Sequence, residues 1–230
     1  MRTFKRNAAF GKFGLQADIR CMLSEGLLYG MALLLFWRVK NYRIGVSMQS
    51  GLSKHDIERI HWMTLALRLP EGGVKAEFQD SDSCVDHFET VRWQSGMFCP
   101  RCDAHDIAPK SARKTYRCRK CAYQFSATTR TFAHGANKKL LTYFLAAEDI
   151  IKRKATMSSF ETIAAHDFKD RHGLAYETAR RLLKLLKNEL LLEDGGLIGR
   201  SICSEEINLP QDFELGGRDH FFWLLEALQA

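Results

Sequence analysis

Apolar residues in the first half of the chain recur at helical spacing in two stretches. Residues 52–68 repeat apolar side chains at intervals of three and four and predict an amphipathic helix. A shorter helix is expected at residues 82–93, and Pro70 to Gly73 breaks the chain between the two. The expected core positions of these helices are Ile57, Ile60, Met63, Leu65, Leu67, Cys84, Phe88 and Val91.

The spacing of apolar residues along the chain changes after residue 98. Tyr123, Phe125 and Ala127 alternate with polar residues, which indicates a strand within residues 99–132. Helical spacing returns at Leu140 and predicts three further helices, over residues 140–152, 158–171 and 175–192. The chain therefore combines a short strand region with helices on both sides of it.

The last two of these helices have the lengths expected of a helix-turn-helix. Ser158 and Glu161 have the spacing of a capping box at a helix start, and Gly173 suits the left-handed position that ends a helix. The second helix, from about Tyr176 to Leu192, has an apolar stripe formed by Ala179, Leu182, Leu183, Leu186 and Leu190. A plain amphipathic helix with solvated Arg and Lys side chains fits the same spacing, so the interpretation stays open at this point.

The strand region carries two cysteine pairs, Cys99-x-x-Cys102 and Cys118-x-x-Cys121, separated by fifteen residues. Two such pairs, brought together by a β-hairpin, supply four thiolates to one tetrahedral ion, and this spacing is typical of zinc. Iron is the competing metal; two disulfides or a redox pair fit less well, since a redox pair needs a βαβ context. His105 is expected to be a loop residue, and Cys21, Cys84 and Cys203 to be ordinary thiols.

Metal binding also bears on folding, because a ribbon of about thirty residues buries too little apolar area to fold alone. The expected fold is α+β: a small four-cysteine zinc ribbon of β-hairpins, then a helix-turn-helix-like α-helical region, with an irregular or helical N-terminal extension. The odd number of cysteines, seven, argues against a secreted disulfide scaffold and favours the cytoplasm.

Positive charge gathers on this middle region. The net charge is +7, and residues 99–155 hold 13 Lys and Arg against 4 Asp and Glu, a local balance of +9. Such a block suits the phosphates of duplex DNA, with a solvated face or a protein docking site as the alternative. The expected DNA contacts are Arg101, Lys114, Arg117, Arg119, Lys120, Arg130, Lys138 and Lys139 to phosphates, and Tyr176, Thr178, Arg180, Arg181 and Lys184 on the second helix of the pair.

The N-terminal residues 1–47 are basic and apolar and predict no packed domain. Residues 26–37 form an apolar run that is too short to span a bilayer and lacks the small residues of a signal-peptide cleavage site. We therefore expect no stable membrane association, and expect that translation natively starts at Met48.

Residues 78 to about 190 resemble bacterial insertion-sequence transposases that begin with a transposase zinc ribbon. The resemblance rests on Phe98-Cys-Pro-Arg-Cys102, Tyr116-Arg-Cys-Arg-Lys-Cys121, Gln124-Phe-Ser126, Thr131-Phe132 and Thr178-Ala-Arg-Arg-Leu182, preceded by Phe78, Cys84, Phe88, Arg92-Trp93 and Gly96. It implies that the ribbon and the following helices recognise element ends, while a ribonuclease-H-like domain with a DDE carboxylate set cuts and joins strands.

The chain departs from that family in three places. Asp103 and Ala122 stand where family members often have glycine, and residues 166–172 lengthen the first helix of the pair. Ser204, followed by Glu205, stands where the resemblance implies the first catalytic aspartate. Only 38 residues, 193–230, follow the helices, and they carry an acidic tail with too little chain for a catalytic scaffold.

We therefore expect a DNA-binding protein that is not an enzyme. Two alternatives remain: a recognition subunit of an active transposase whose catalytic domain is on another chain, or a zinc-ribbon adaptor for protein or RNA. The expected regions are an N-terminal extension (1–47), a helical lead-in (48–98), a zinc ribbon (99–135), a helix-turn-helix-like region (136–192) and an acidic tail, the truncated or degenerate start of a catalytic domain (193–230).

Overall fold

The computed structural model describes residues 52–109, 111, 114–157, 161–210 and 214–229. Several expectations lie outside these ranges, namely those for residues 1–47, for the apolar run within residues 1–47, for the start at Met48 and for the Ser158 cap. Among the described residues, no helix is both long and apolar enough to cross a bilayer.

Both helices expected in the first half of the chain are present. Helix α2 spans Lys54–Leu67 and α4 spans Ser81–Arg92, and each begins with a capping box, at Ser53 and at Asp80. A one-turn helix, α3 (Val74–Glu77), lies between them. Of the expected core positions, Ile57 and Leu67 are half-buried and the other six are buried, while buried Trp62 is an addition to that set.

The middle of the chain forms a small sheet. Strands β1 (Ile107–Ala108), β2 (Tyr116–Cys118) and β3 (Gln124–Phe125) pair antiparallel in that order. The alternation over residues 123–128 predicts a longer strand than the two residues observed. The strand ends early because the Ser126 N–H donates to Thr129 Oγ1, and the Thr129 N–H donates back to the Ser126 carbonyl.

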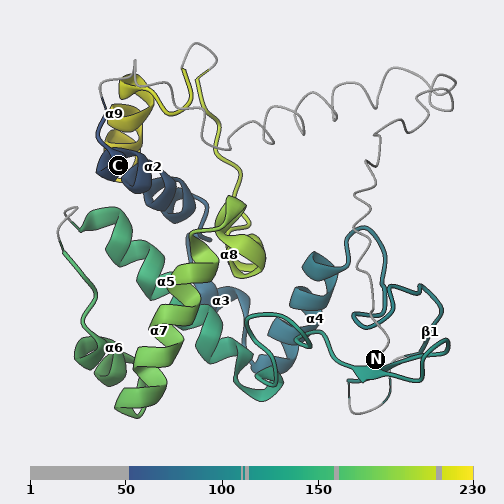
Figure 1. The fold of residues 1–230 in the computed structure, drawn as a ribbon. Helices are drawn as coiled ribbons and strands as arrows, with labels where there is room; N and C mark the ends of the chain where they lie inside the picture. Colours follow the sequence, from purple (N-terminus) through teal and green to yellow (C-terminus); the bar gives the residue numbers. More distant parts are fainter. Residues whose placement is uncertain (1–51, 110, 112–113, 158–160, 211–213, 230) are drawn as a thin grey trace, which may run out of the picture. The chain divides into compact units, whose positions relative to one another are not determined.

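The second half of the chain is helical. A 3-10 turn, η1 (Asn137–Lys139), leads into α5 (Leu140–Thr156), which is followed by α6 (Ala165–His172) and α7 (Tyr176–Leu190). Helices α5 and α7 lie side by side (Figure 1) and both pack against other helices of the core. The apolar stripe predicted for α7 is confirmed, with four positions buried and Leu183 half-buried.

Helix α6 is shorter than the sequence predicts. The expected capping box is wrong for one of its two residues, Glu161. Glu161 is not helical, and the residue preceding the first helical position is Ala164, which has no side-chain cap. The Glu161 carbonyl instead accepts a hydrogen bond from Lys154, and Ile163 packs on the core. These contacts hold residues 161–164 as a non-helical connection, so α6 has eight residues.

The C-terminal region, expected to be an acidic tail, contains two helices that pack against other helices. After the short turn η2 (Glu193–Gly195), helix α8 (Gly196–Ile202) is buried, and α9 (Arg218–Ala227) packs against α2. Gly196 has a φ of 65°, and a Cβ there would lie 2.6 Å from the Glu189 carbonyl oxygen, so α8 can start this close to α7 only at glycine. The carboxylate of Glu189 accepts the Leu197 N–H and thereby caps α8.

Candidate metal centre and basic surfaces

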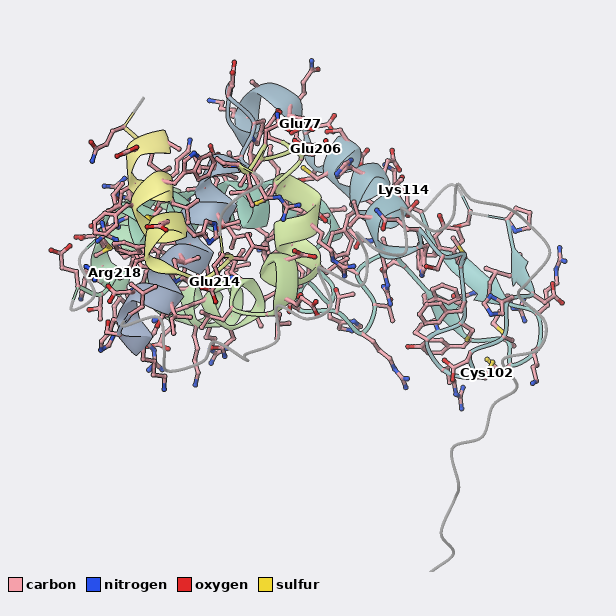
Figure 2. All side chains as sticks on the ribbon, turned by 90° about the horizontal axis from the view of Figure 1, so that it is seen from above. Glu77, Cys102, Lys114, Glu206, Glu214 and Arg218 are labelled. Carbon is pink, nitrogen blue, oxygen red and sulfur yellow. The ribbon has the colours of Figure 1, made fainter. Side chains whose placement is uncertain are left out.

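The two cysteine turns bring four sulfur atoms together. All four Sγ atoms lie within 4.8 Å of one another, and the Cys99–Cys121 and Cys102–Cys118 pairs are each 3.6 Å apart. Four thiolates at about 2.3 Å from one zinc ion occupy the corners of a tetrahedron with edges of about 3.8 Å. The observed sulfur cluster therefore fits a single tetrahedral metal ion without rearrangement of the turns. Figure 2 shows Cys102 in this cluster.

The two turns repeat the same backbone pattern. The first cysteine of each pair, Cys99 or Cys118, donates its N–H to the carbonyl of the residue five positions later, at 2.9 Å in both turns. The residue after each second cysteine, Asp103 or Ala122, has a left-handed backbone with φ of 55° and 57°. These are the two positions where the resemblance implies glycine.

Ionisation of the thiols is uneven before a metal binds. Burial raises the pKa of Cys99, but hydrogen bonds from the N–H groups of Arg101 and Cys102 outweigh it and lower the pKa to about 7. A hydrogen bond from the Ala104 N–H lowers the Cys102 pKa. The neighbouring thiols and burial raise it by more, so that the Cys102 pKa is about 12. One thiol thus ionises near neutral pH while a neighbour keeps its proton. A divalent cation removes this conflict because it stabilises all four thiolates together.

Aromatic contacts join the ribbon to α4. The Trp93 ring meets Tyr116 edge-on at 5.4 Å between centroids and Phe125 at 6.2 Å. The Tyr116 hydroxyl donates to Glu89 Oε2 at 2.8 Å, and the Arg92 guanidinium donates to the Ala127 carbonyl. One side of the sheet is therefore fixed to the helix that precedes it.

Lys114 takes part in the same attachment. Its Nζ lies 3.3 Å from Asp82 and 3.4 Å from Asp86, both on α4, and its side chain is only 28% exposed. Figure 2 shows Lys114 beside that helix. The sequence predicts a phosphate contact at this position, whereas the structure gives the ammonium two carboxylate partners within the protein.

The other described basic residues of the ribbon, and Lys138 and Lys139 after it, are exposed and have different surroundings. Arg101 lies 5.8 Å from the Tyr123 ring centroid, Arg119 forms an ion pair with Asp106 at 3.1 Å, and Arg130 donates to the Pro100 carbonyl. In the part of the chain that the structure describes, no ion pair or hydrogen bond is seen for the side chains of Arg117, Lys120, Lys138 and Lys139. The last two stand at the start of α5.

Helices α6 and α7 are joined by three residues, 173–175. Gly173 ends α6 in the left-handed conformation at φ 59°, and α7 begins at Tyr176. Phe168 of α6 and Ala179 of α7 are both buried in the common core. The exposed residues of the first turns of α7 are Tyr176, Glu177, Thr178, Arg180, Arg181 and Lys184.

Contacts around these two helices orient several of the predicted DNA-binding residues. The Tyr176 ring lies 4.6 Å from the His166 ring of α6, and Arg180 forms an ion pair with Glu177 at 3.2 Å. Glu177 is not among the DNA-binding residues expected from the sequence. The spacing of three residues between opposite charges on a helix is the signal that predicts the pair.

The carboxylates near the predicted catalytic position are exposed. Ser204, Glu205 and Glu206 follow α8 on the surface, and the Glu205 N–H donates to the Arg68 carbonyl at 3.1 Å. Phe221 and Leu224 of α9 are buried.

Residues 79–124 match a family described as "Transposase zinc-ribbon domain". The matched segment covers all of α4, the sheet as far as Gln124 and all four cysteines. Comparison with curated proteins and with solved structures gave no match. The chain thus contains a transposase-associated zinc ribbon, with a four-cysteine cluster able to hold a metal ion.

Proposed function

We propose that this chain is a zinc-dependent protein that binds duplex DNA as the recognition part of an insertion-sequence transposase does, and that it neither cuts nor joins DNA. The observation that carries the proposal is the exposed start of α7. This helix follows a three-residue turn, buries one stripe and presents Tyr176, Thr178, Arg180, Arg181 and Lys184 to solvent. A recognition helix of a helix-turn-helix offers its N-terminal residues to base edges in this way.

Zinc is the metal proposed for the ribbon. Four thiolates with no open position suit a structural ion, and the 3.6 Å sulfur separations suit tetrahedral geometry. The ion would be held by Cys99, Cys102, Cys118 and Cys121, and it would fix both turns of the ribbon rather than take part in a reaction.

Phosphate binding is assigned to Lys184, further along α7, and to the exposed cations outside that helix. Arg101, Arg117, Arg119, Lys120 and Arg130 belong to the ribbon, and Lys138 and Lys139 stand at the N-terminus of α5, where the helix dipole adds positive potential. Lys114 is left out of this set because α4 already neutralises it.

Selection of duplexes from a random pool by the purified, zinc-loaded chain tests the binding proposal. If about five phosphates are contacted, log K falls against log salt with a slope of roughly −4 to −5. Equal binding of random duplexes, or a preference for RNA of matched sequence, would favour an adaptor instead.

Catalytic inactivity is proposed because Ser204 stands where the resemblance implies the first catalytic aspartate. A hydroxyl cannot replace a carboxylate as a bridging ligand for two divalent ions. Selected duplexes incubated with magnesium or manganese should show no nicking and no strand transfer. Metal-dependent cleavage that disappears in Glu205→Gln would contradict this part and leave the binding proposal intact.

A further inference from the structure

Over the residues that the structure describes, the ribbon sheet has one covered side and one free side. Side chains alternate along a strand, so Tyr116 and Phe125 turn toward Trp93 and α4, while Arg117 and Gln124 turn away. Arg117 and Gln124 are direct partners across β2 and β3, and both are exposed. The buried aromatic contacts therefore fix an exposed arginine–glutamine pair on a rigid backbone.

The chemistry of this pair is that of base recognition. An arginine fork matches the O6 and N7 acceptors of guanine, and a glutamine amide matches the N6 donor and N7 acceptor of adenine. Directly opposed residues on antiparallel strands have Cβ atoms about 4.5–5.5 Å apart. Arginine and glutamine side chains are long enough to reach from this separation to two neighbouring base pairs, which lie about 3.4 Å apart along the duplex. The major groove of duplex DNA is wide enough to admit a two-stranded β-ribbon.

The charges beside the pair favour a polyanion as the occupant. Arg119 and Lys120 follow β2 directly, and Arg101 lies on the other cysteine turn. Among the described residues from 99 to 125, the acidic side chains are Asp103 and Asp106, and Asp106 is already paired with Arg119. The Ala108 side chain opposite Arg117 is small and leaves the guanidinium free to extend.

We propose that the free side of the ribbon sheet enters the major groove of duplex DNA, where Arg117 contacts a guanine and Gln124 contacts an adenine of an adjacent base pair. This inference rests on the proposed duplex binding and adds a second base-reading element beside α7. It changes the role of Arg117 from the phosphate contact that the sequence predicts to a base contact, and it gives Gln124 a function.

The test uses the zinc-loaded full chain and a duplex that it selects from a random pool. Each guanine and adenine is replaced in turn by its 7-deaza analogue, which removes the N7 acceptor and keeps Watson–Crick pairing. The unaltered protein should lose about tenfold in affinity, within a range of roughly 5- to 100-fold, at one guanine and one neighbouring adenine. Arg117→Met should lose its sensitivity at that guanine only, and Gln124→Met at that adenine only, as a double-mutant cycle requires.

Lys120→Gln is the matched control, since it removes an exposed ribbon charge outside the pair. It should weaken all duplexes alike and keep both sensitivities. Sequence-selective binding in which both variants keep full sensitivity to both analogues would overturn the inference and leave duplex binding standing. Duplex binding without sequence preference would overturn it in the same way, whereas absence of duplex binding by the unaltered protein would overturn the proposed function as well.

Discussion

Asp103 and Ala122 adopt the same left-handed conformation at equivalent places in the two cysteine turns, with φ of 55° and 57°. This conformation costs a residue with a Cβ about 1–2 kcal/mol, and aspartate tolerates it better than alanine because its short polar side chain can form local hydrogen bonds. The turn after Cys121 is therefore held against a local backbone preference by the pairing of Cys118 with Tyr123 and by the sulfur cluster.

Ala122→Gly should stabilise the ribbon. Removal of the Cβ removes about 1–2 kcal/mol of backbone strain. Glycine loses more conformational entropy on folding, and this offsets roughly 0.5–1 kcal/mol of the gain. We expect a net gain of up to about 1.5 kcal/mol in the free energy of unfolding, measured by denaturant titration with saturating zinc. Asp103→Gly should gain less. A loss of stability in Ala122→Gly would show that the left-handed turn is not strained.

The sulfur cluster predicts one zinc ion per chain. Elemental analysis of the purified protein should give close to one equivalent, and Cys118→Ser should lose most of it, because three thiolates and a hydroxyl bind zinc far more weakly. Cys84→Ala is the control: burial raises the pKa of Cys84 to about 12, so that thiol stays protonated at neutral pH. Full retention of zinc in Cys118→Ser would contradict the site.

The sequence predicts helices and the metal cluster correctly where a single kind of interaction determines the structure. The period of α2, α4, α5 and α7 follows from a single buried stripe on each helix, and the spacing of Cys99, Cys102, Cys118 and Cys121 determines how they meet around one point.

Prediction fails where long-range contacts compete with a local signal. Glu161 has the sequence of a capping box, but its carbonyl bonds to Lys154 of the preceding helix and the chain stays non-helical there. The basic run around Lys114 gives no sign of the ion pairs that it forms with Asp82 and Asp86, about thirty residues earlier in the chain. Ile198 and Ile202 belong to an acidic segment, and they are buried because α8 packs against α4, α5 and α7. None of these partners is recognisable from spacing alone.

Acid should weaken the docking of α9 through His220. This side chain is buried, and its Nδ1 accepts the Gly216 N–H at 3.0 Å, so a proton on Nδ1 would break that bond. Burial lowers the His220 pKa below its ordinary value of 6.5. A base with a lowered folded pKa contributes stability that is fully present above pH 6.5 and is lost as pH falls through the folded pKa.

The measurement is hydrogen exchange of the α9 amides between pH 7.5 and 5, with rates corrected for intrinsic pH dependence. Protection should fall with pH in the unaltered protein and stay nearly constant in His220→Gln, whose amide oxygen remains an acceptor. Zinc is kept saturating so that protonation of the cysteines does not contribute. Equal pH dependence in both proteins would rule out His220 as the titrating group.

Glu177 should set base preference through Arg180. The two side chains form an exposed ion pair at 3.2 Å in the first turns of α7, and such a pair adds little stability. In the major groove, however, the carboxylate can accept from cytosine N4 while it holds the arginine fork toward guanine. Glu177→Gln should therefore broaden the selected sequence at one or two positions, and Arg180→Met should lose the guanine preference there.

Two measurements separate this role from a general effect of charge. Glu177→Gln removes a negative charge, so it should bind non-specific duplex more tightly while the ratio of specific to non-specific affinity falls by about tenfold, equivalent to roughly 1.4 kcal/mol. Lys184→Gln, one turn further along α7, should weaken specific and non-specific binding together because a phosphate contact carries no sequence information. If Glu177→Gln instead raises both affinities by the same factor, the carboxylate acts only as a repulsive charge, and Arg180 reads DNA without its help.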